Sequence, residues 1–79
     1  MNNNLEKYNK VFMDLFGVQE FELGTLKLKE STNWDSVGHI GLISVLEETF
    51  DVNLDSDDMF DLISYQKGIQ TLKKYDVNF

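Results

Sequence analysis

A polar, irregular segment gives way to a helical apolar pattern at Ser36, and this change limits the folds open to the chain. Leu42, Leu46 and Phe50 recur at the i, i+4, i+8 spacing of one helix face. Asp35 or Ser36 can accept a hydrogen bond from a first-turn N–H, as capping residues do where helices begin. The spacing therefore predicts a helix from Ser36 to about residue 50.

The first part of the chain carries a second pattern of helical spacing. Its apolar residues recur at intervals of three and four: Leu5, Tyr8, Val11, Phe12, Leu15 and Phe16. Asn3 and Glu6 have the spacing of a capping box, and Gly17 lies where a left-handed helix end is expected. These features predict a helix over about residues 4–16, with its aromatic side chains in the core.

Residues 17–35 can be interpreted in two ways. Residues 21–23 and 26–29 alternate as strands do, and Gly24-Thr25 could form the turn of a hairpin. An isolated two-stranded hairpin is barely stable, whereas a long ordered loop can hold apolar side chains against a helical core. The loop is the favoured interpretation, and four apolar residues would anchor it: Phe21, Leu23, Leu26 and Leu28.

Two further helices are expected in the last third of the chain. Ser56-Asp57-Asp58 opens a short helix that carries Met59, Phe60, Leu62 and Ile63. Ser64 can cap a final helix, whose inward residues would be Tyr65, Ile69, Leu72 and Tyr75, and residues 76–79 are expected to fray. The chain is thus predicted to be a single all-α domain over residues 1–79, a small four-helix bundle with a long first connection and a short third helix.

Composition and charge restrict the functional classes. Fourteen acidic residues against seven basic ones give a formal charge of −7, the wrong sign for binding nucleic-acid phosphates. The same charge would steer the chain toward basic patches on partner proteins. The chain has no cysteine, so any thiol would have to arrive on a prosthetic group. The start lacks a signal-peptide pattern and no apolar run could span a membrane, so a cytoplasmic protein is expected.

Two motifs carry a resemblance to a known family. Asp35-Ser36-Val37 opens the predicted helix, and Leu46-Glu47-Glu48-Thr49-Phe50 followed by Asp51-Val52-Asn53-Leu54 ends it. Together they resemble the Asp-Ser-Leu and Leu-Glu-Glu-x-Phe motifs of the acyl carrier proteins, including the separation between the two. The resemblance extends from about Leu5 to Leu72.

In that family the serine after the aspartate carries a 4′-phosphopantetheine arm, which a phosphopantetheinyl transferase takes from coenzyme A. The resemblance therefore implies that Ser36 is the attachment residue and Asp35 its neighbouring motif residue. It implies a monomeric carrier without catalytic activity, which holds an acyl or aminoacyl group as a thioester. Its partners would be the transferase, a loading ligase and an acyltransferase or synthase of fatty-acid or secondary-metabolite biosynthesis.

The chain departs from the family around its serine. Gly38, His39 and Gly41 stand where acidic residues are common, and Asn33-Trp34 stands where Leu-Gly is common. A charge-poor first half of this helix resembles stand-alone carriers that are devoted to a specialised acyl or aminoacyl group.

A second face of the predicted helix over 36–50 is expected to meet partners, as this helix does in the family. At about 100° per residue, five residues cluster opposite the core face: Val37, Ile40, Gly41, Ser44 and Glu48. Val37 and Ile40 would form the apolar centre of a docking surface. Glu47, Glu48 and Asp51 would supply its steering charges.

Other interpretations of these residues are weaker. Ser36 and His39 could suggest a hydrolase, but Trp34 stands where a nucleophile elbow needs glycine, and no orienting acid is evident. His39 is better interpreted as a partly buried boundary residue and Trp34 as a cover over the start of the helix.

Residues 51–57 alternate oxygen-bearing side chains as a calcium loop does. Ser56 replaces the required glycine and Leu62 the closing glutamate, so no specific metal site is expected. An acidic helical module that binds proteins without a prosthetic group remains the alternative to a carrier.

Overall fold

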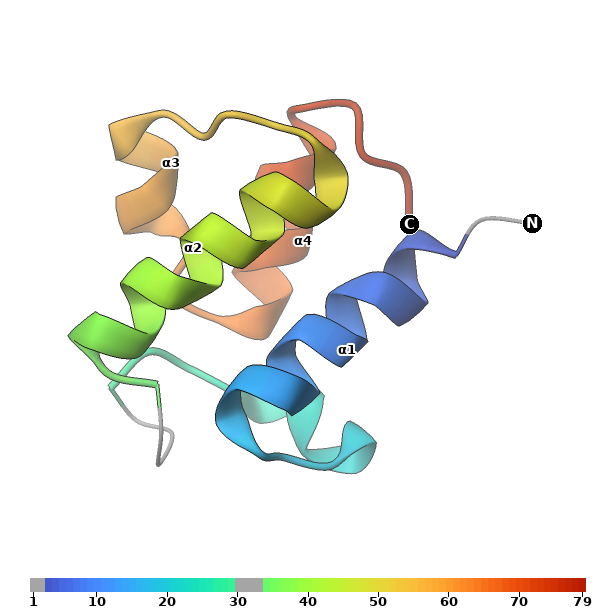
Figure 1. Ribbon diagram of the computed structural model, residues 1–79, viewed down its shortest axis with the longest axis vertical. Helices are drawn as coiled ribbons and strands as arrows, with labels where there is room; N and C mark the ends of the chain where they lie inside the picture. Colours follow the sequence, from blue (N-terminus) through green and yellow to red (C-terminus); the bar gives the residue numbers. More distant parts are fainter. Residues whose placement is uncertain (1–2, 30–33) are drawn as a thin grey trace.

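The computed structural model describes residues 3–29 and 34–79, and in these ranges the chain is helical apart from its connections (Figure 1). The elements follow one another as α1 (Asn4–Phe16), the 3-10 helix η1 (Glu20–Thr25), α2 (Ser36–Phe50), α3 (Ser56–Asp61) and α4 (Tyr65–Lys73). The predicted small all-α bundle is confirmed. No helix in the described ranges has the length and apolar character needed to cross a membrane.

Residues 17–29, the described part of the first connection, form a loop with the 3-10 turn η1 rather than a hairpin. Its only strand-like pairing within the described residues is an isolated bridge between Lys27 and Ser64. Leu23 and Leu26 are buried, but Phe21 is 81% exposed, so its expected role as an anchor is wrong. A 3-10 helix turns by about 120° per residue, so within η1 the Phe21 and Leu23 side chains lie on different sides.

Helix ends follow the predicted signals with one exception. Gly17 has φ +65° and ends α1 in the left-handed conformation, and Ser64 accepts a hydrogen bond from the Lys67 N–H at 3.0 Å to begin α4. The predicted capping box at the start of α1 does not form, because the Asn3 side chain makes no capping hydrogen bond. A capping box forms instead at η1, between Gln19 and Glu22.

The helices enclose a core in which aromatic rings meet leucines. In Figure 1, α2 crosses the front of the molecule with α1 on one side and α3 on the other, and α1 and α2 are in contact. Seven large side chains are fully buried: Trp34, Tyr8, Phe12, Leu42, Leu46, Leu62 and Leu72. The Tyr8 hydroxyl donates to the Tyr65 carbonyl at 2.7 Å, and burial, with a smaller effect of the Tyr65 hydroxyl, raises the pKa of Tyr8.

The C-terminal tail packs on the bundle, contrary to the expected fraying. Val77 is buried, and the Phe79 ring lies 5.4 Å from the Tyr8 ring and 6.0 Å from the Phe50 ring. The Asn78 carbonyl accepts a hydrogen bond from the Asn4 side chain at 2.9 Å, which joins the tail to the start of α1. Two apolar residues in a four-residue tail were the signal for this packing.

A buried carboxylate joins α3 to the end of α4. Asp58 is 6% exposed and accepts hydrogen bonds from the Lys74 ammonium and the Tyr75 hydroxyl. These two bonds, the one from Lys74 first, lower the pKa of Asp58 below its ordinary value of 3.8. Asp58 was expected only to help open α3, so its role as a partner for α4 went unpredicted.

The Asp58 contacts should make stability depend on pH in the acid range. Because the folded-state pKa is depressed, the contribution is complete above the ordinary value of 3.8 and disappears as the pH falls through the lower folded value. We expect Asp58→Asn to lower the free energy of unfolding at neutral pH and to converge with the parent protein in acid. Urea unfolding of both proteins across this pH range measures the difference in their free energies of unfolding. A difference that persists unchanged in strong acid would contradict the role of the Asp58 carboxylate.

Candidate functional site

Ser36 is the first residue of α2 and lies exposed to solvent. Of the two possible caps it is Asp35 that serves, since its carboxylate accepts a hydrogen bond from the Gly38 N–H at 2.8 Å. Capping by Asp35 leaves the Ser36 side chain on the surface, at the positive end of the helix dipole. A negatively charged group would be stabilised at this helix start.

Trp34 fixes the chain just before this site. Its side chain is 0% exposed, and its ring stacks on Phe16 at 5.3 Å and meets Phe12 edge to face at 5.3 Å. Its carbonyl accepts a hydrogen bond from the Lys29 N–H at 2.7 Å. Trp34 therefore lies deep in the core, further inside than the edge position that its sequence context suggested.

His39 connects three segments through its ring. Its Nδ1 accepts the indole N–H of Trp34 at 3.1 Å, and its Nε2 lies 2.8 Å from the Met59 carbonyl in α3. The half-buried position expected for His39 is confirmed. Because both ring nitrogens are engaged elsewhere, His39 cannot take the proton of Ser36, and the arrangement does not support a serine–histidine pair.

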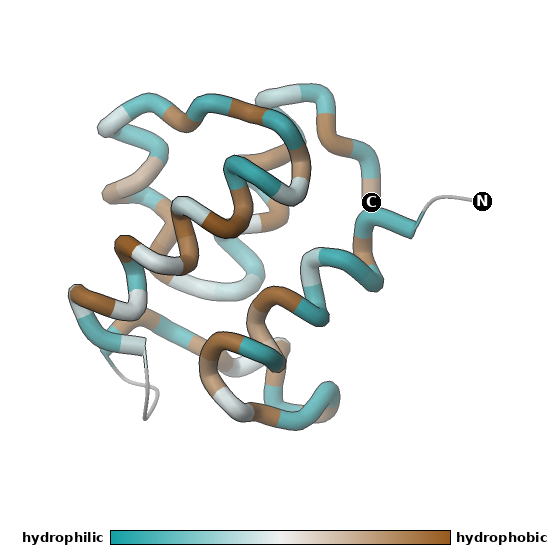
Figure 2. Tube along the Cα trace, viewed as in Figure 1, coloured by the Kyte–Doolittle hydropathy of each residue, from teal (hydrophilic) through white to brown (hydrophobic). Residues whose placement is uncertain are grey.

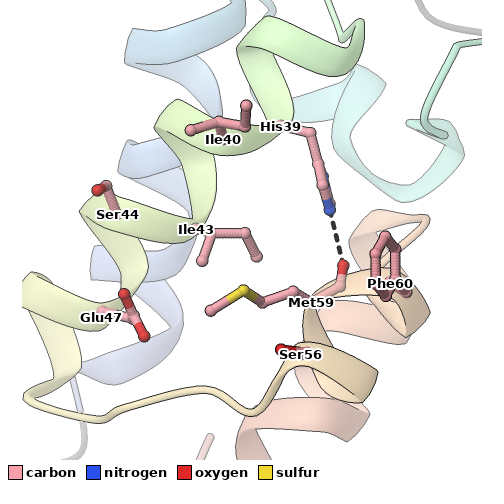
Figure 3. Close-up of a pocket in the computed structure, with 8 residues that line it drawn as sticks. All are labelled: His39, Ile40, Ile43, Ser44, Glu47, Ser56, Met59 and Phe60. Carbon is pink, nitrogen blue, oxygen red and sulfur yellow. Dashed lines mark hydrogen bonds between the residues drawn. The ribbon is translucent and has the colours of Figure 1, made fainter.

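A groove runs between α2 and α3, starting one helical turn after Ser36 (Figure 3). Its volume is ≈ 370 Å³, and eight residues line it: His39, Ile40, Ile43, Ser44, Glu47, Ser56, Met59 and Phe60. Figure 3 shows Ile43 and Met59 facing each other across it, with Glu47 and Ser56 toward its other end. Sequence reasoning did not find the contribution of α3, although adjacent Met59 and Phe60 in so short a helix were a signal.

The outward face of α2 carries most of the residues expected there. Val37 is 78% exposed and Ile40 72%, and Glu48 and Asp51 are also exposed. Figure 2 shows apolar residues along much of the length of α2. Phe60 of α3 is 78% exposed, so it adds an apolar side chain beside the groove.

Two residues that were expected on the exposed docking face instead contact other parts of the protein. Gly41 faces α1, because a Cβ built on it would lie 3.8 Å from Leu15 Cδ2, so its placement on the outward face is wrong. Glu47 is half-buried, and its carboxylate accepts the Leu54 N–H at 2.9 Å. Glu47 thus holds the connection between α2 and α3 in place, which is a structural role separate from the steering role expected for its charge.

Two aspartates in the acidic segment that follows α2 contribute to the fold through their backbone. Asp51 ends α2 in the left-handed conformation with φ +54°, and the Asp55 N–H donates to the Tyr75 hydroxyl oxygen at 3.0 Å. Within residues 3–29 and 34–79, no three His, Asp or Glu side chains group in a way that could hold a metal ion.

Comparisons with protein-family models, with curated proteins and with solved structures find no match to this chain.

Proposed function

We propose that the protein is a non-catalytic acyl or aminoacyl carrier, in which Ser36 bears a 4′-phosphopantetheine arm. The observation that supports this most strongly is the exposed Ser36 at the start of α2, with Asp35 as the helix cap. A serine held at a helix start, beside an apolar groove, is a suitable attachment point for a long thiol-bearing arm. The carrier would act as a monomer in the cytoplasm.

The surroundings of Ser36 fit a phosphodiester at its hydroxyl. The helix dipole favours the added negative charge, and Oδ1 of the Asp35 carboxylate accepts the Gly38 N–H as the helix cap. Both ring nitrogens of His39 are engaged by Trp34 and Met59, and the base that takes the hydroxyl proton would come from the transferase. The arm, once attached, supplies the thiol that the chain itself lacks.

The partners that we propose are a phosphopantetheinyl transferase, a loading ligase and an acyltransferase or synthase. They would dock on α2 and the adjoining edge of α3, where Val37, Ile40 and Phe60 form an exposed apolar centre. Glu48 and Asp51 are exposed and would steer basic partner surfaces to this face. A nucleic-acid partner does not fit the net charge of −7.

Exposed and buried apolar residues of α2 should respond differently to truncation. Leu46→Ala should destabilise the fold by about 2–5 kcal/mol, because Leu46 is fully buried. Val37→Ala and Ile40→Ala should cost far less stability and instead speed dissociation of the transferase.

Glu48→Lys should slow association of the transferase and weaken the dependence of that rate on salt. Surface binding across a salt series, with thermal melts of each variant, measures these effects.

An Ile40→Ala protein that melts as low as Leu46→Ala, while its folded fraction binds normally, would place Ile40 in the core and contradict this docking face. Glu47→Lys is a useful comparison, since it also breaks the hydrogen bond to Leu54 and should lower stability as well as binding.

The alternative is an acidic helical module that binds proteins through the same apolar surface and carries no arm. The exposure of Val37, Ile40 and Phe60 suits such a module equally, because none of the three needs a prosthetic group in order to be contacted. A thiol assay separates the two functions. Incubation with coenzyme A and a broad-specificity transferase should add one phosphopantetheine and one reactive thiol to a chain without cysteine. A well-folded chain that gains neither would leave only the binding module.

A further inference from the structure

His39 lies next to the proposed attachment site. The role that we assign to it from its contacts rests on the carrier function proposed above. His39 lies one helical turn after Ser36 on α2, and its backbone N–H donates to the Asp35 carbonyl at 2.8 Å. Its ring contacts the buried indole of Trp34 and the Met59 carbonyl of α3, and Figure 3 shows the second of these contacts. The end of the long loop, α2 and α3 thus meet at one imidazole.

The hydrogen bonds determine which ring nitrogen of His39 carries the proton. An indole N–H can only donate, so the Nδ1 that faces Trp34 has to be the acceptor. The hydrogen of the neutral ring then lies on Nε2, where it is donated to the Met59 carbonyl. This tautomer satisfies the indole donor, which is fully buried and would otherwise lose a hydrogen bond.

Trp34 lies close to the attachment site in the chain. Only Asp35 separates Trp34 from Ser36, and the Trp34 ring is fixed on its other side by Phe12 and Phe16. The bond from Trp34 to His39 therefore joins the end of the long loop to the first turn of α2.

We propose that His39 is a positioning residue for Ser36, which holds Trp34 against α2 and so presents the serine hydroxyl to the transferase in one fixed place. A transferase that docks on α2 and α3 has to align its bound coenzyme A with the Ser36 hydroxyl. The carrier, and not the transferase, holds this hydroxyl in place. Loss of the bond between Trp34 and His39 should then lower the rate of the chemical step more than it weakens docking.

Two substitutions of His39 separate its two contacts. The side-chain oxygen of Asn reaches about as far as Nδ1, so His39→Asn can still accept from Trp34 while it loses the contact with Met59. The side-chain nitrogen of Gln reaches about as far as Nε2, so His39→Gln keeps the donor to Met59 and loses the acceptor for Trp34. Both variants lose one hydrogen bond, and we expect similar losses of thermal stability.

The experiment is the steady-state kinetics of phosphopantetheine transfer to the wild type and both variants, below their melting temperatures. We expect His39→Gln to lower kcat by about tenfold with KM little changed, and His39→Asn to retain a kcat close to that of the wild type. The indole proton resonance of Trp34 should shift in His39→Gln and stay in His39→Asn. In a Trp34→Phe background, His39→Gln should have no further effect on kcat, because the bond that it removes is already absent.

A kcat for folded His39→Gln equal to that of the wild type, with the indole resonance displaced, would overturn the positioning role and leave the carrier function intact. Equal losses of kcat in both variants would also overturn it, since the contact with Trp34 would then have no special part. Failure of the wild type itself to accept phosphopantetheine would overturn the carrier function, and the inference with it.

Discussion

Gly68→Ala should destabilise the protein by about 2–4 kcal/mol, the sum of an overpacked core and a broken buried hydrogen bond. A Cβ built on Gly68 in α4 would lie 2.0 Å from the Tyr8 hydroxyl oxygen and 3.3 Å from Leu62 Cδ2. Tyr8 has little room to move, because it is fully buried and its ring is 4.8 Å from Phe12 and 5.1 Å from Tyr65. Urea or thermal unfolding measures the loss.

Helix propensity alone leads to the opposite expectation. Alanine is favoured over glycine inside a helix by about 1 kcal/mol, so Gly68→Ala would be stabilising if only α4 mattered. Gly41→Ala is the matched control, since a Cβ there would make an ordinary contact of 3.8 Å with Leu15. We expect Gly41→Ala to raise stability by up to about 1 kcal/mol.

The Tyr8 hydroxyl is the atom responsible for the close approach, and a double-mutant cycle tests this. Tyr8→Phe removes the oxygen that a new methyl group would strike, so Gly68→Ala should cost much less in that background. If Gly68→Ala is neutral or stabilising in the wild type, then α4 can shift away from α1, and close packing is not the reason for glycine at this position.

Local signals in the sequence were sufficient to predict the α-helices, although not the 3-10 helix η1. Apolar spacing set α1 and α2, and Gly17, Asp35 and Ser64 marked helix ends because each acts on its own neighbouring backbone. The features that were missed depend on contacts between distant segments. The close approach of Gly68 to Tyr8 joins α4 to α1, and the packing of Phe79 on Phe50 joins the tail to α2.

The candidate site shows the same division. The exposure of Ser36 and the cap at Asp35 follow from the local pattern at the start of α2, and so does the exposure of Val37 and Ile40. The contact of His39 with the Met59 carbonyl could not be predicted in that way, because Met59 lies twenty residues further along the chain. Periodicity also failed at Gly41, where a helical wheel cannot show that α1 packs on that side.

Ser36→Ala should abolish attachment of phosphopantetheine while leaving the fold nearly unchanged. The hydroxyl is the only group that the substitution removes, and Ser36 is exposed at the start of α2, where Asp35 rather than Ser36 accepts the capping hydrogen bond. Ser44→Ala is the matched control, since Ser44 is another exposed serine of the same helix, two turns further along. Both variants should therefore melt close to the wild type.

The central claim is that Ser36 is the attachment residue, and intact mass after incubation with coenzyme A and a broad-specificity transferase tests it most directly. The wild type and Ser44→Ala should each gain the mass of one phosphopantetheine, and Ser36→Ala should gain nothing. Modification that persists in Ser36→Ala, or that fails in a well-folded wild type, would contradict the carrier function.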